Sequence, residues 1–139
     1  MSHTPLLMFV NGQAMSGGSI SHNLAGATFL GPAITADKYR FYSVRDEFPG
    51  IHPVETGGYS IPGELYAVTY ETLRDRLLPS EPVELELGVI QLLDGSGTLC
   101  MRMREEWLDS PDSTDISDKG GWRSYLRLKG LPETPPAGE

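Results

Sequence analysis

Short apolar runs and two-residue alternations recur along the chain and predict a fold rich in strands. Leu6 to Val10 is an apolar run that ends at Asn11-Gly12, which predicts a buried strand leading into a turn. Tyr39 to Val44 alternates large apolar and polar residues, as a half-buried strand does. Gly63 to Val68 is a further predicted strand, so strands dominate the first half of the chain.

Glycine and proline divide these strands. Gly31-Pro32 interrupts Thr28 to Thr35, which predicts two short extended pieces, and Phe48-Pro49-Gly50 is a turn signal. The loop NGQAMSGGS follows the first strand, contains three glycines and ends in serines that can cap a short helix around Ser21 to Leu24.

One helix of good length is predicted from Tyr70 to Leu78. Thr69 is a suitable N-cap, and Pro79 ends the helix. The apolar positions at helical spacing are Leu73, Leu77 and Leu78.

The second half of the chain predicts antiparallel structure. Apolar residues alternate with polar ones from Leu85 to Val89, and Asp94-Gly95 is a hairpin turn before the strand Thr98 to Met103. Asp109 to Asp118 has the composition of a surface loop. Three large apolar residues after it are expected to dock one last element on the core: Trp122, Tyr125 and Leu126.

These elements fit one α+β domain. With 139 residues, 39% of them hydrophobic, the chain has enough apolar surface for a single core without disulfides or metals. We expect that domain to cover residues 1–129. Residues 130–139 are proline-rich and poor in apolar residues, which predicts a disordered tail.

Charge and cysteine content narrow the function classes. A net charge of -8 without a Lys/Arg cluster argues against nucleic acid and anionic lipid as partners. No stretch approaches the roughly 20 apolar residues that cross a bilayer. Cys100 is the single cysteine, so an intramolecular disulfide is impossible, no zinc-ligand spacing exists, and a reducing, cytoplasmic location is expected. The sequence predicts neither a metal nor a cofactor.

Three local features can carry chemistry, each with a plainer alternative. The glycine-rich turn after Val10 can present backbone N–H groups to a carboxylate, or can be only a tight connection. Glu81 lies between Pro79 and Pro82, which can hold a carboxyl group for proton transfer or leave an ordinary exposed side chain. Glu64 and Tyr66 share a strand face, which is either a pocket wall or a solvated surface.

Six segments in order resemble the gamma-glutamylcyclotransferase-like (AIG2-like) superfamily, and most closely the allophanate hydrolase C-terminal domain. They are MFVNGQAMSGG, GATFLGPAIT, YRFYSVRDEFPGIHPV, GGYSIPGELYAV, ELELGVIQLLDG and GGWRSYL, and they span most of residues 6–126. The resemblance implies a small mixed or antiparallel β-barrel with flanking helices and a pocket covered by the first glycine loop.

The resemblance also implies roles for individual residues. The loop that binds a substrate carboxylate through its backbone in cyclotransferases corresponds here to Asn11, Gly12, Gln13, Ala14 and Met15. Its Tyr-Gly-Ser/Thr-Leu pattern is reduced to the glycine, and this departure favours the allophanate hydrolase branch.

The family's general acid/base is a glutamate just after the helix. Glu81 stands at about that position, with Glu84 as the alternative if the register is shifted. By the same resemblance, Glu64 and Tyr66 line the pocket.

The resemblance favours an enzyme that acts on a carboxylated amide or urea-derived compound in a lyase or decarboxylation-like step. The alternative is a non-catalytic accessory module that docks on an amidase-like partner. The expected partners are a small carboxylate-bearing ligand, an amidase-family protein and a second copy of the chain.

Overall fold

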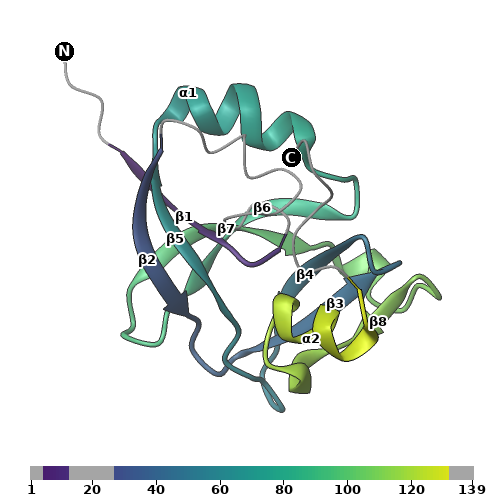
Figure 1. Cartoon of the computed structure of the whole chain (residues 1–139). Coiled ribbons are helices and arrows are strands. Elements are labelled where there is room, and N and C mark those ends of the chain that lie inside the picture. Colours follow the sequence, from purple (N-terminus) through teal and green to yellow (C-terminus); the bar gives the residue numbers. More distant parts are fainter. Residues whose placement is uncertain (1–4, 13–26, 132–139) are drawn as a thin grey trace.

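A computed structural model describes residues 5–12 and 27–131 (Figure 1). The strands are β1 (Leu6–Val10), β2 (Thr28–Ile34), β3 (Tyr39–Val44), β4 (Phe48–Pro53), β5 (Pro62–Val68), β6 (Leu85–Gln91), β7 (Gly97–Met103) and β8 (Ser113–Asp115). They form one mixed sheet of eight strands in the order β2-β5-β1-β7-β4-β3-β8, with β6 paired to β7. The α+β class predicted from the sequence is confirmed.

The sheet is not closed into a barrel, so that part of the prediction is wrong. Among the described strands, β2 pairs along its length with β5, and a single bridge between Thr35 and Leu92 links the chain after β2 to the chain after β6. β2 has a register shift between Phe29 and Gly31 and contains Pro32, which has no N–H to donate. Both features are typical of an edge strand, so β2 ends the sheet instead of closing it.

β7 is the centre of the sheet. It pairs antiparallel with β6 from Leu85 to Gln91, as the predicted hairpin requires, and in parallel with both β1 and β4. The core packs around it and contains the fully buried side chains of Phe9, Phe41 and Ile51. β7 therefore places the end of β1 beside the start of β4.

The predicted helix is present as one continuous helical stretch of three kinds. It begins with α1 (Tyr70–Thr72), continues as a π-helical segment, η2 (Leu73–Leu77), and ends in a 3-10 turn, η3 (Leu78–Ser80). Thr69 caps it as expected, since its side chain accepts a hydrogen bond from the Thr72 N–H at 3.1 Å. Leu73 and Leu77 are buried in the core, and the backbone becomes extended at Glu81.

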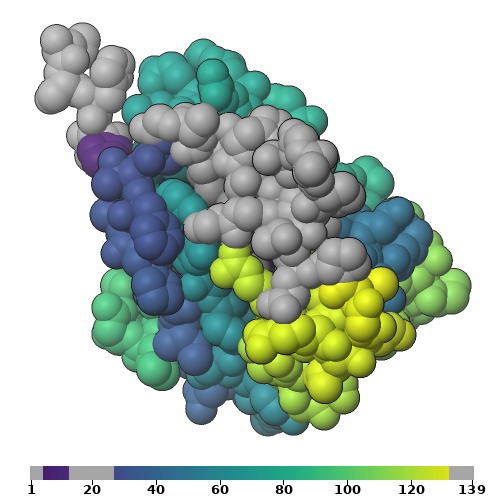
Figure 2. All heavy atoms as spheres, viewed as in Figure 1, coloured from purple at the N-terminus to yellow at the C-terminus, as the bar shows by residue number. Residues whose placement is uncertain are grey.

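The last part of the chain lies at the end of the sheet that contains β3 and β8 (Figure 1). It comprises η4 (Glu105–Trp107), η5 (Ser117–Lys119) and α2 (Trp122–Lys129). Trp122, Tyr125 and Leu126 of α2 are buried, as predicted. Figure 2 shows α1 and α2 at opposite ends of the view. Neither helix, in the part of the chain that the structure describes, has the length and hydropathy needed to cross a membrane.

Two local predictions are corrected. Phe48-Pro49-Gly50 is not a turn but the start of β4, and the chain reverses instead at Arg45 and Asp46. The aspartate-rich loop contains the short strand β8, which pairs with β3. The predicted helix at Ser21–Leu24 and residues 132–139 of the predicted tail lie outside the described residues.

Candidate functional site

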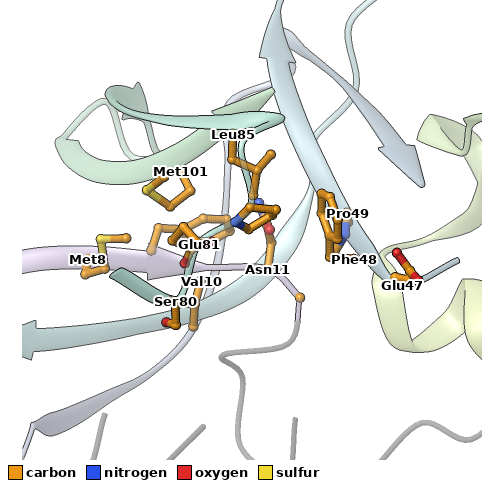
Figure 3. Close-up of a pocket in the computed structure, with 13 residues that line it drawn as sticks. Met8, Val10, Asn11, Glu47, Phe48, Pro49, Ser80, Glu81, Leu85 and Met101 are labelled. Atoms are coloured by element: carbon orange, nitrogen blue, oxygen red, sulfur yellow. The ribbon is translucent and has the colours of Figure 1, made fainter. Parts of the chain in front are cut away.

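A cavity of about 260 Å³ lies between the end of β1, the start of β4 and the segment that follows η3 (Figure 3). Its apolar lining includes Met8, Val10, Phe48, Pro49, Leu85 and Met101. The polar side chains on its wall are those of Asn11, Glu47, Ser80 and Glu81. A mainly apolar hollow with a few convergent polar groups is typical of a small-molecule site.

β1 brings Asn11 and Gly12 to the cavity. Both are buried, and the Asn11 Nδ2 donates to the Cys100 Sγ at 3.9 Å. A side chain at position 12 would collide with the ring of Pro49. Gly12 is therefore required for the close approach of β1 to β4, which brings these two cavity walls together.

Glu81 enters the cavity from the end of the helical stretch. Its backbone N–H donates to the Leu78 carbonyl at 3.2 Å, and it is flanked at short range by Pro79 and Pro82. Figure 3 shows its side chain near Met8 and Val10, with Pro49 across from it. No hydrogen bond joins the Glu81 carboxyl group to any residue within 5–12 or 27–131. Burial raises the pKa of Glu81 to about 7.

Glu84 has a different environment from Glu81. Its side chain is buried, and its Oε2 accepts a hydrogen bond from the Arg45 Nη1 at 3.0 Å. Glu84 is not part of the cavity wall. The structure therefore separates the two glutamates between which the sequence left a choice: Glu81 faces the cavity, and Glu84 is ion-paired beside it.

The structure places Glu64 and Tyr66 of β5 elsewhere. The Tyr66 hydroxyl donates to Glu64 Oε1 at 3.1 Å, and Arg123 of α2 donates to Glu64 Oε2 at 3.4 Å. Glu64 lines a second hollow of about 190 Å³ together with the start of α2. Of the predicted loop residues, Gln13, Ala14 and Met15 lie outside the described residues, so Asn11, Gly12 and Glu81 are the predicted residues brought together here.

Sequence reasoning missed the wall contributed by β4. Glu47, Phe48 and Pro49 line the cavity, although Phe48-Pro49-Gly50 suggests a turn. No local pattern places these residues beside β1, because their position depends on the separate pairing of β1 and β4 with β7. Local sequence patterns do not reveal which distant strands pair, so this wall of the cavity could not be predicted from them.

The described residues include no group of three or more His, Cys, Asp and Glu side chains suited to a metal ion. Cys100 does not line the cavity, but its Sγ accepts the hydrogen bond from Asn11, which does. Burial, and next to it the negative charge of Glu81, raises the pKa of the Cys100 thiol. The thiolate is therefore disfavoured, and Cys100 is not suited to act as a nucleophile.

A family model matches residues 6–127, and its description is "Allophanate hydrolase C-terminal domain". The chain belongs to the allophanate hydrolase C-terminal domain family. The family predicted from the sequence is thus confirmed.

Solved structures agree with this assignment. A uropathogenic E. coli-specific protein is 32% identical with a TM-score of 0.83, over 89% of this chain and 97% of that chain. Kluyveromyces lactis allophanate hydrolase is 24% identical with a TM-score of 0.81, over 93% of this chain and 22% of that chain. An AIG2-like protein from Mus musculus shares the fold, with 19% identity and a TM-score of 0.65 over 99% and 100% of the two chains.

The chain thus corresponds to about a fifth of the yeast allophanate hydrolase and to nearly all of the E. coli protein. In the yeast enzyme, the matching domain is part of a much longer chain. No curated protein matches the chain.

Proposed function

We propose that the cavity binds a small carboxylated amide or urea-derived compound, and that Glu81 transfers a proton in a lyase or decarboxylation-like step. The observation that carries this proposal is the position of the Glu81 carboxyl group. It faces a cavity of about 260 Å³, lies between two prolines, and has no hydrogen bond to the described residues. A carboxyl group in this position can bind a ligand without breaking a hydrogen bond to the described residues.

The raised pKa of Glu81 suits proton transfer. A carboxyl group with a pKa of about 7 is close to half protonated at neutral pH, where it can both donate and accept a proton. Among the described residues, the titratable groups around it include Glu47 on the cavity wall, the ion-paired Glu84 and the Cys100 thiol. In loss of CO₂ from an N-carboxylated amide, the N–C bond breaks, its electrons remain on nitrogen, and the nitrogen takes the proton from Glu81.

The titration of Glu81 predicts how ligand binding depends on pH. An ionised Glu81 repels a carboxylate ligand, whereas the protonated form donates a hydrogen bond to it. Affinity for a carboxylate should therefore fall as pH rises through about 7. Glu81→Gln keeps a donor that does not titrate, so its affinity should stay constant across this range.

The test combines binding and turnover. Thermal shifts with malonate, biuret and allophanate identify a ligand, because a compound that binds only the folded state raises the melting temperature. Release of CO₂ from allophanate then measures turnover in the wild type, Glu81→Gln and the exposed control Glu55→Gln. Glu81→Gln should still bind but lose turnover. Equal turnover in wild type and Glu81→Gln would end the assignment of Glu81 as the acid/base.

A second candidate function is a non-catalytic accessory module that docks on an amidase-like partner. It is favoured by the relation to the yeast allophanate hydrolase, in which the matching domain occupies 22% of a longer chain. A module of this kind should show no thermal shift with any of the three compounds. It should instead co-elute with an amidase-family protein in size-exclusion chromatography.

A further inference from the structure

The hairpin between β3 and β4 has an unusual backbone. Arg45 has φ of 54° and Asp46 has φ of 58°, so both adopt the left-handed conformation. The Glu47 N–H donates to the Val44 carbonyl at 2.9 Å across this turn. Glycine, asparagine and aspartate normally occupy such positions, and arginine there is strained. Strain of this kind persists where surrounding contacts hold the residue in place.

Those contacts converge on the Arg45 side chain. Its Nε donates to Glu47 at 2.9 Å, and its Nη1 donates to Glu84 at 3.0 Å and to Asp112 at 3.2 Å. Its backbone N–H also donates to the Asp112 carbonyl at 2.9 Å. The guanidinium lies 5.8 Å from the centre of the Phe48 ring.

Two of these partners, Glu47 and Glu84, lie on the two different segments that form walls of the Glu81 cavity. Glu47 and Phe48 form part of the wall at the start of β4. Glu84 lies in the segment that forms the other wall, between Pro82 and Leu85, which both line the cavity. Arg45 therefore joins the two walls through one planar group, a geometry that a guanidinium provides and an ammonium does not.

Glu84 connects Arg45 to Glu81, because Glu84 is buried and lies close to Glu81 in sequence. The chain between them is short and includes Pro82, which restricts the backbone. The Glu84 carbonyl also accepts a hydrogen bond from the Arg104 N–H at 2.8 Å, which anchors the segment to the chain after β7. A shift of Glu84 would thus be transmitted directly to Glu81.

We propose that Arg45 is a positioning residue for this site: by holding Glu47 and Glu84 together, it sets the separation of the cavity walls and keeps the Glu81 carboxyl group facing the interior. The inference rests on the proposed function of Glu81. Arg45 itself does not line the cavity and is not assigned a chemical step.

The test measures the pKa of Glu81 by carboxyl-carbon NMR, without any ligand. Arg45→Met alone leaves Glu84 buried without its partner, so the main variant is the pair Arg45→Met with Glu84→Gln. Glu84→Gln alone keeps an amide oxygen that can accept from Arg45. The matched control is Arg40→Met, which breaks the ion pair between Arg40 of β3 and Asp115 of β8, two residues that do not line the cavity.

The pKa of Glu81 should be about 7 in the wild type and should stay there in Glu84→Gln and in Arg40→Met. In the pair Arg45→Met with Glu84→Gln, water should enter between the walls and lower this pKa by about one unit or more. An unchanged pKa in that pair would overturn the positioning role, as would an equal fall in Arg40→Met. Failure of the proposed function has a different signature: Glu81 keeps its raised pKa, but none of the three compounds binds.

Discussion

Replacing Glu81 by glutamine should stabilise the folded protein at high pH and leave it unchanged at low pH. Burial raises the pKa of Glu81 from its ordinary value of 4.5 to about 7. The folded protein therefore holds the proton between these two pH values, while the unfolded chain has lost it. As a result, the free energy of unfolding decreases as pH rises through this window. Above about pH 7 the folded protein bears the whole cost of keeping an ionised Glu81 buried.

The size of the effect follows from the same pKa values. Each pH unit corresponds to about 1.4 kcal/mol, so ionised Glu81 reduces the free energy of unfolding by about 3 kcal/mol. Glutamine has nearly the same shape and never ionises. Glu81→Gln should equal the wild type near pH 4.5 and exceed it by about 3 kcal/mol above pH 7.

Urea denaturation at several pH values between 4.5 and 8.5 measures this difference, about the range over which Glu81 changes charge. Subtracting the wild-type curve from the variant curve cancels the contributions of the other titrating groups. Glu55→Gln, at an exposed site, is the control and should follow the wild type throughout. Parallel curves for the wild type and Glu81→Gln would refute the reasoning, because they would mean that the Glu81 carboxyl group is hydrated in the folded state.

Two further substitutions test the contacts around the site. Gly12→Ala should reduce the free energy of unfolding by about 1–3 kcal/mol, because the new methyl group collides with Pro49; an unchanged urea midpoint would contradict the contact. Tyr125→Phe removes the hydrogen bond that Asp46 accepts and that lowers its pKa, and should reduce the free energy of unfolding by about 1 kcal/mol at neutral pH. Since this stabilisation requires ionised Asp46, the deficit should begin to shrink below the ordinary pKa of an aspartate and disappear below the lowered pKa of folded Asp46, when urea unfolding is repeated in acid.

Much of the fold could be predicted from local patterns. β1, β3 and the β6–β7 hairpin were expected because their apolar residues alternate or cluster within a few positions. The helix from Tyr70 was expected for the same reason, with Thr69 as its cap. Each of these elements is specified by residues close together in sequence, so its pattern can be recognised in a single sequence.

The missed features depend on distant contacts. The turn at Arg45 and Asp46 has none of the usual turn residues except an aspartate, and it is stabilised by Asp112 and Tyr125 from the far end of the chain. The choice between Glu81 and Glu84 was open for the same reason. Arg45, 39 residues before Glu84, forms an ion pair with that glutamate, whereas Glu81 faces the cavity.

Two departures from ordinary protein chemistry lie at the cavity or beside it in the described structure. Glu81 is a carboxyl group held where ionisation is unfavourable, and Arg45 has a backbone conformation unusual for arginine. Both features oppose folding, Glu81 at the cavity and Arg45 in the hairpin that leads into its wall. Local violations of this kind are expected where a site is maintained for function. A merely structural hollow would be more stable with glutamine at position 81, so a buried carboxyl group there supports the proposed site over an accessory surface.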